Sequence, residues 1–259
     1  MPRPRLLLLP NLTELEWVIR PLIEQWAEVA SFDAPGVGDE PAAERAGPAA
    51  ILARGHAEID RLGWDRFVIA ADEFAASAAA ALATERREAV QGMALGHASL
   101  AFRRAGERPT VSAEIVDVGV QMFRTDFRAF VREEIAVWDP RRTGGRAPEE
   151  RDALIDEYLE RVSAETAVAF YEQVLADESP EASIEPLLRE LGGPLLLAEH
   201  EDCPLFTREG YEDIVAAFPD AATVSCPVKP SMSLEFAVAL RSFCERIESP
   251  NEARPARPG

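Results

Sequence analysis

One stretch decides the fold of this chain: Phe67-Val68-Ile69-Ala70-Ala71-Asp72-Glu73-Phe74-Ala75-Ala76. Its first half is a short apolar run, which is typical of a buried strand, and the alanine-rich continuation to residue 83 favours a helix. The two halves meet at Asp72 and Glu73. A sharp turn that carries two carboxylates is therefore predicted between the strand and the helix.

Short apolar runs alternate with helical patterns along most of the chain, which indicates βαβ units and a parallel sheet. The predicted strands are residues 5–9, 28–32, 66–71, 90–95, 194–198 and 223–227. The predicted helices are residues 14–26, 49–62, 73–86, 184–191, 207–218 and 233–247. We therefore expect an α/β protein with an open, mostly parallel six-stranded sheet and helices on both faces.

Residues 98–181 interrupt this alternation, because they show amphipathic helical patterns and no convincing strand. Two helical segments, 111–138 and 148–176, flank a Pro- and Gly-containing breaker. We predict that 98–181 is a helical cap inserted into a core formed by residues 1–97 and 182–248. The Pro-, Arg- and Asn-rich residues 249–259 are predicted to be a disordered tail.

Composition narrows the function classes. The 259 residues are 47% hydrophobic, and the net charge of −19 disfavours partners such as nucleic acid or an anionic membrane surface. No apolar run approaches the roughly 20 residues of a membrane-spanning helix or the about 7 to 15 of a signal-peptide core. The three cysteines, Cys203, Cys226 and Cys244, show no ligand-like spacing, so neither disulfides, a metal site nor a cofactor is expected. A cytoplasmic protein with a small-molecule partner is favoured, and a homodimer stays open.

Four segments resemble the α/β-hydrolase superfamily over nearly the whole chain. Residues 6–11 are similar to the family's strand and oxyanion-hole turn, and Asp33-Ala34-Pro35-Gly36-Val37-Gly38 is similar to its D-x-P-G-x-G turn. The stretch around Glu73 stands at the family's nucleophile elbow. Residues 194–204 stand where the family carries its catalytic acid, for which the resemblance implies Asp202.

The chain departs from this family at two catalytic positions. In the family elbow, G-x-S-x-G, the serine attacks the substrate, whereas here Ala71 and Ala75 take the glycine places and Glu73 takes the serine place. A frame with Asp72 as nucleophile puts the bulky Phe74 where a small residue is needed. The loop at 227–233, where the resemblance implies the general-base histidine, contains none, and a serine-type triad requires one.

Chemically active side chains follow several predicted strands at the carboxyl edge of the sheet, the edge where open α/β folds bind ligands. The candidate catalytic residues are Glu73, His97, His200 and Asp202. The candidate ligand-binding residues are Asn11, Leu12, Asp72, Phe74, Phe123, Phe127 and Lys229.

Glu73 has two interpretations. In one, Asp72 and Glu73 open a helix and accept its first backbone N–H groups. In the other, Glu73 occupies the amides that hold the oxyanion in the family, and Lys229 pairs with Glu73 or Asp202. His97 and His200 are each interpreted either as a hydrogen-bonded structural residue or as a proton partner of Glu73.

Three functions follow from these residues. The leading one is a hydrolase-like protein without the standard triad, which binds a small apolar ligand between core and cap or catalyses a non-hydrolytic reaction there. The alternatives are an active hydrolase with a rearranged Glu/His/Asp site and a non-catalytic interaction scaffold.

Overall fold

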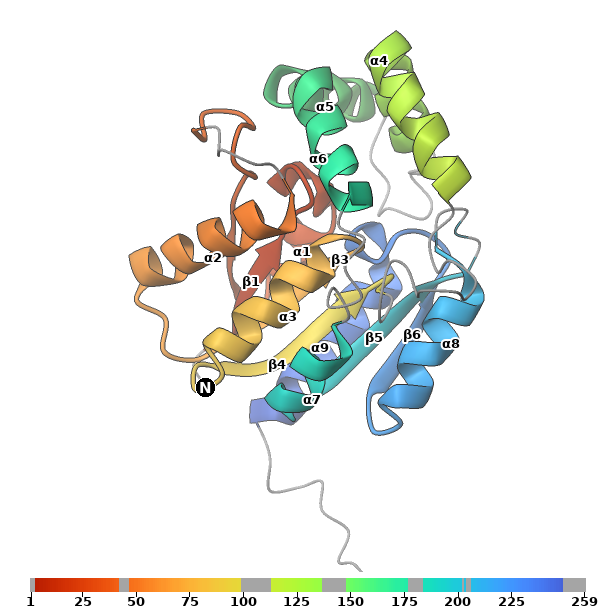
Figure 1. The fold of residues 1–259 in the computed structure, drawn as a ribbon. Coiled ribbons are helices and arrows are strands. Elements are labelled where there is room, and N and C mark those ends of the chain that lie inside the picture. The colour runs from red at the N-terminus through yellow and green to blue at the C-terminus, as the bar shows by residue number, and fades with distance from the viewer. Residues whose placement is uncertain are drawn as a thin grey trace, which may run out of the picture.

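The computed structural model contains one sheet of six parallel strands in the order β2-β1-β3-β4-β5-β6 (Figure 1). The strands are β1 (Arg5–Leu9), β2 (Glu28–Ser31), β3 (Phe67–Asp72), β4 (Val90–Gly96), β5 (Leu195–His200) and β6 (Ala222–Cys226). All six predicted strands are present, with ends shifted by no more than two residues. The structure describes residues 3–41, 47–98, 113–136, 148–176, 184–201, 203 and 206–248.

Two layers of helices cover the sheet, and the alternation of side chains in β1 explains why. Leu7 and Leu9 pack into the core beneath α2 (Pro48–Leu62), α3 (Ala75–Glu85), α7 (Glu185–Leu191) and α8 (Arg208–Ala217). Leu6 and Leu8 pack on the other face, against α1 (Arg20–Ile23) and α9 (Leu234–Glu248). Every residue of β3 is buried, as expected for a central strand covered on both faces.

Three further helices, α4 (Ala113–Ala136), α5 (Pro148–Arg161) and α6 (Ala164–Ala176), form a group beyond the end of the sheet to which the strands point (Figure 1). Arg124 pairs with Glu172 and Arg128 with Asp156, so ion pairs join α4 to both neighbours. Helix α4 has a kink at Asp126, whose carboxylate accepts a hydrogen bond from the amide of Ala129.

The Asp33 to Gly38 turn docks this helical group onto the sheet. Arg161 at the end of α5 binds Asp33 Oδ2 at 3.2 Å, and its carbonyl accepts a hydrogen bond from the amide of Gly38 at 2.9 Å. Gly38 has φ +57°, and a Cβ atom there would lie 2.9 Å from the Asp33 carboxylate. The turn therefore needs glycine for its conformation and for the close approach.

Two helix predictions were wrong. Residues 14–26 form a 3-10 turn, η1 (Glu14–Glu16), and the four-residue α1 instead of one helix, because Trp17 ends the turn with its indole N–H bonded to the Leu9 carbonyl at 3.0 Å. Residues 148–176 form two helices, separated at residues 162 and 163, where Ser163 caps the second helix through the Thr166 amide. The predicted tail, 249–259, lies outside the described residues. In the described ranges, no helix is long and apolar enough to cross a membrane.

Candidate functional site

Glu73 occupies a strained turn between strand and helix. Strand β3 ends at Asp72 and α3 begins at Ala75, and Glu73 between them has φ +51°. A left-handed conformation costs a non-glycine residue roughly 1–2 kcal/mol. The Glu73 amide donates to the Gly96 carbonyl at 2.9 Å, which holds the turn against the end of β4. The sharp elbow is thus present, with a carboxylate at its tip.

The Glu73 carboxylate is buried in an ion pair. Its side chain is 2% exposed, and Lys229 Nζ lies 3.0 Å from Oε1 and 3.1 Å from Oε2. The Asn11 amide nitrogen donates to Oε2 at 3.3 Å. These partners of the Glu73 carboxylate come from the loops that follow β1 and β6, and α3 begins two residues after Glu73.

Glu16 takes the backbone amides that Glu73 was expected to occupy. The Asn11 amide donates to Glu16 Oε2 at 2.8 Å and the Leu12 amide to Oε1 at 3.1 Å. The Asn11 side chain meanwhile accepts from the Ala75 amide at 2.9 Å. The prediction that Glu73 fills these amides is corrected, because η1 turns the Glu16 carboxylate back onto the loop that follows β1.

Burial gives the Glu16 carboxyl group an unusual protonation state. The residue keeps part of its surface exposed, but its carboxyl group points inward, and burial raises its pKa from 4.5 to about 7. The Lys229 charge and the hydrogen bonds from the loop amides oppose this rise. Glu16 is consequently a mixture of acid and carboxylate at neutral pH.

Asp72 fixes the loop that carries Lys229. It is 4% exposed, and its Oδ2 accepts from the Ser231 amide at 3.0 Å. A Cβ atom at Gly96 would lie 2.7 Å from Asp72 Oδ1 and 2.7 Å from Pro230. Because no larger residue fits between them, Gly96 lets the end of β3 and the loop after β6 approach each other. Asp72 therefore positions the loop that carries Lys229, whereas Glu73 is the residue at the tip of the elbow.

The two histidines predicted at the carboxyl edge lie together. His97 follows β4 with φ +52° and is 4% exposed, and His200 ends β5. Their ring centroids are 5.5 Å apart, and His97 Nδ1 lies 4.0 Å from Glu73 Oε1. Burial, with the nearby His200 and Lys229, lowers the pKa of His97 from 6.5 to about 3, so its ring is neutral at pH 7. Asp202, the predicted third partner, lies outside the described residues.

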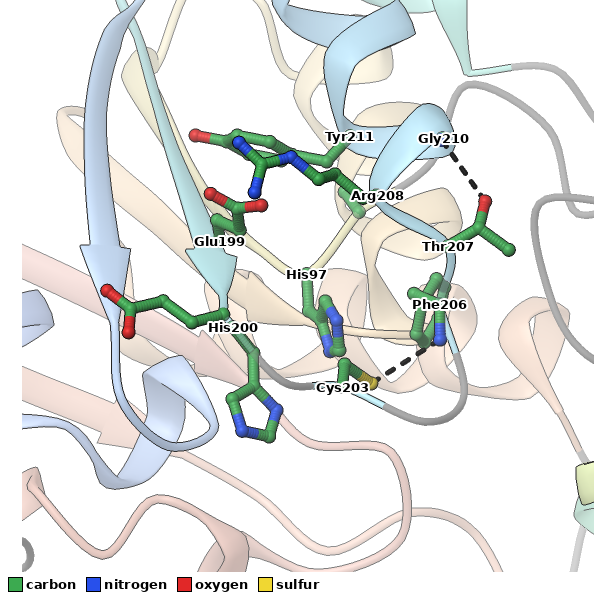
Figure 2. Close-up of a pocket in the computed structure, with 11 residues that line it drawn as sticks. His97, Glu199, His200, Cys203, Phe206, Thr207, Arg208, Gly210 and Tyr211 are labelled. Carbon is green, nitrogen blue, oxygen red and sulfur yellow. Dashed lines mark hydrogen bonds between the residues drawn. The ribbon is translucent and has the colours of Figure 1, made fainter.

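A small cleft with a volume of about 80 Å³, partly open to solvent, lies beside these histidines at the start of α8 (Figure 2). Its lining residues are His97, Ala98, Glu199, His200, Glu201, Cys203, Phe206, Thr207, Arg208, Gly210 and Tyr211. Cys203, which has no ligand-like spacing to the other cysteines, stands three residues after His200 and lines this cleft with it. The donor atoms of His97, His200 and Cys203 lie within 4.8 Å of one another.

Aromatic rings pack between the elbow and the helical group. Phe74 contacts Phe170, Tyr171 and Phe206, with ring centroids 6.4, 5.6 and 5.5 Å away. Phe123 continues the cluster, with centroids 5.1 Å from Tyr171 and 5.8 Å from Phe127. Of the predicted ligand-binding residues, Phe74 and Phe123 are thus packed against other side chains, and Asn11, Leu12 and Asp72 are buried in the site.

Solved structures identify the class of fold, although no protein-family model and no curated protein matches the sequence. A bromoperoxidase from Bacillus anthracis superposes with a TM-score of 0.73 at 14% identity, covering 95% of this chain and 92% of the other. An esterase from Thermogutta terrifontis gives 0.70 at 19% identity, covering 95% and 90%. A hydrolase from Oleispira antarctica gives 0.70 at 12% identity, covering 95% and 92%. The chain has the α/β-hydrolase fold.

Proposed function

We propose that this α/β-hydrolase-fold protein binds a small molecule at the carboxyl edge of its sheet and performs no serine-type acyl transfer. One observation carries the proposal: the elbow presents Glu73 in a buried ion pair with Lys229, with both carboxylate oxygens about 3 Å from the ammonium. An acyl-enzyme mechanism requires a nucleophile activated by a base. Here the Lys229 ammonium stands beside the elbow and compensates the charge of the carboxylate.

The first oxyanion position is occupied as well. The amides of Asn11 and Leu12 follow β1, where the family supplies one oxyanion donor, and both bind Glu16. A developing oxyanion would have to displace this side chain. The nearest imidazole, His97, is 4.0 Å from Glu73 and has a pKa of about 3, which makes it a weak base. A rearranged Glu73 and His97 hydrolase is therefore the less favoured enzyme.

The cleft beside Phe206 is the proposed ligand site. It is open to solvent, and Phe206 and Tyr211 offer apolar surface next to the polar side chains of Glu199 and Thr207. Small-molecule sites combine apolar walls with polar groups that fix the ligand's orientation, and this cleft offers both. We further propose that α4 to α6 act as a cap over this edge, with the aromatic cluster around Phe74 as their seat.

Two assays test the proposal. We expect no labelling by a fluorophosphonate probe and no hydrolysis of a panel of aryl esters above background. Ester hydrolysis that is lost in Glu73→Gln would establish the rearranged enzyme instead.

Thermal shift with a library of small aromatic acids and amides tests binding. A ligand at 100 times its Kd stabilises the native state by about 2.7 kcal/mol. Tyr211→Leu should weaken the shift, whereas Val238→Ala, which is 59% exposed on α9, should leave it unchanged. The aromatic packing is also compatible with a non-catalytic interaction scaffold. That alternative function is favoured if no library member shifts the melting temperature.

A further inference from the structure

We propose that His97, His200 and Cys203 form a binding site for a thiophilic divalent transition-metal ion, with Zn²⁺ as the preferred ion. The three residues come from the ends of two neighbouring strands and the turn after the second. Figure 2 shows their side chains gathered in the lower part of the cleft, at the end of β5. The inference goes beyond the proposed function and does not depend on the state of the elbow.

The spacing of the donor atoms suits a metal ion after a small adjustment. The three atoms lie within 4.8 Å of one another. In a tetrahedral zinc site, bond lengths of about 2.0–2.1 Å to nitrogen and 2.3 Å to sulfur place neighbouring donors about 3.4–3.6 Å apart. The widest gap, at most 4.8 Å, must therefore close by about 1.2–1.4 Å. His97 is buried and fixed, whereas His200 and Cys203 are partly exposed and close the gap by side-chain rotation.

The backbone holds His200 and Cys203 in one turn. The Cys203 amide donates to the His200 carbonyl at 3.3 Å, and the Glu201 amide donates to the Cys226 carbonyl of β6 at 3.0 Å. The Phe206 amide donates to Cys203 Sγ at 3.4 Å. An amide that donates to Sγ also stabilises a metal-bound thiolate, because a hydrogen bond to a charged acceptor is the stronger one. Metal binding releases the thiol proton to solvent.

The buried His97 supplies the second, independent observation. Its Nδ1 makes no hydrogen bond with the described residues, although the ring is 96% buried against Phe206 and His200. A buried polar atom without a partner is rare and points to a ligand. The Glu73 carboxylate lies 4.0 Å from Nδ1, beyond hydrogen-bond distance, and does not satisfy it.

The donor types select the metal. One thiolate and two imidazoles favour Zn²⁺ over Mg²⁺ or Ca²⁺, which prefer oxygen ligands. Three protein ligands leave the fourth position of a tetrahedral ion to the cleft, as in zinc sites that bind water or a substrate.

Cobalt provides a direct test, because Co²⁺ reports its ligands through its visible spectrum. We expect equimolar Co²⁺, added to chelator-treated full-length protein, to give tetrahedral d–d bands and a thiolate-to-cobalt charge-transfer band. The charge-transfer band should disappear in Cys203→Ser and persist in Cys244→Ala. Absence of the band in the wild-type protein overturns the proposal, whatever the variants do.

Competition with a chromophoric chelator then measures Zn²⁺ affinity. Cys203→Ser and His200→Asn should each weaken binding by more than the roughly 10- to 100-fold that loss of a secondary partner costs. His56→Asn, on helix α2, should leave it unchanged, and the melting temperature of each metal-free variant checks its fold. The 46 acidic side chains of this chain make adventitious binding the natural rival. Equal Zn²⁺ affinities of Cys203→Ser and Cys244→Ala would assign any bound zinc to the acidic side chains and refute the proposed site.

Discussion

Lys229→Met tests whether the Glu73 pair determines the stability of the elbow. The substitution keeps the length of the side chain and removes its charge, so a carboxylate that is 2% exposed loses its counter-ion. Breaking a buried pair by removing one partner costs about 3–5 kcal/mol. The Lys229 side chain is 27% exposed, so solvent screens part of the interaction, and we expect about 3 kcal/mol. For a chain of this size, that loss lowers Tm by about 6–12 °C.

Equilibrium urea unfolding at pH 8, followed by circular dichroism, measures the loss. The double variant Glu73→Gln/Lys229→Met should regain about 2 kcal/mol, because neither partner is then left as a buried charge. Arg241→Met serves as the matched control, because its ion pair with Glu245 is exposed by 58% and 62%, and it should change stability by less than about 0.5 kcal/mol. An exposed ion pair contributes up to about 1 kcal/mol. If Lys229→Met lowers the free energy of unfolding by less than this, the Glu73 pair does not behave as a buried pair and the prediction is refuted.

Four further substitutions are predicted. Between pH 4.5 and 7 the folded protein retains the Glu16 proton that the unfolded chain releases, so the free energy of unfolding of the wild-type protein falls as pH rises through this window. Glu16→Gln should remove up to about 3 kcal/mol of that fall, less the part that solvent screens at this partly exposed residue. Urea titrations at pH 5 and pH 8 measure the difference. Gly96→Ala forces a Cβ to 2.7 Å from Asp72 and should lower stability by about 1–3 kcal/mol in urea unfolding. Gly119→Ala, with open space around it in α4, should instead raise stability by about 0.5–1 kcal/mol and increase helical circular dichroism. Phe74→Ala should cost about 3–5 kcal/mol and expose α6 to proteolysis, and an unchanged protease pattern would show that the aromatic cluster does not seat the helical group.

The sheet was predictable because each strand carries its own signal. A central parallel strand is covered on both faces, so β3 appears in the sequence as an uninterrupted apolar run, and the same holds for Leu6 to Leu9 of β1. The turn from Asp33 to Gly38 also carries local information, because its glycines adopt backbone angles that other residues avoid. These features depend on neighbours in the chain, which a sequence pattern records.

The partners in the site were only partly predictable, because they depend on contacts between distant segments. The Lys229 pairing could be suggested from its place after the last strand. Glu16 could not, since its contact with the Asn11 and Leu12 amides requires η1 to replace a regular helix. Cys203 was overlooked for a different reason: it was weighed against the other cysteines, whereas its partner is His200, three residues earlier.

The geometry of the ion pair with Glu73 explains why position 229 carries lysine and not arginine. It is the only lysine among 27 basic residues, and it stands where one cation must meet both oxygens of a buried carboxylate. A compact ammonium does so from one point, whereas a guanidinium binds through a planar fork and needs more room. Asn11 already bonds Glu73 Oε2, and Ser231 beside the loop is held by Asp72. The loop therefore has little freedom to retreat. Lys229→Arg should lower stability by about 1–3 kcal/mol although it keeps the charge, and a neutral result in urea unfolding would show that the loop yields to the larger group.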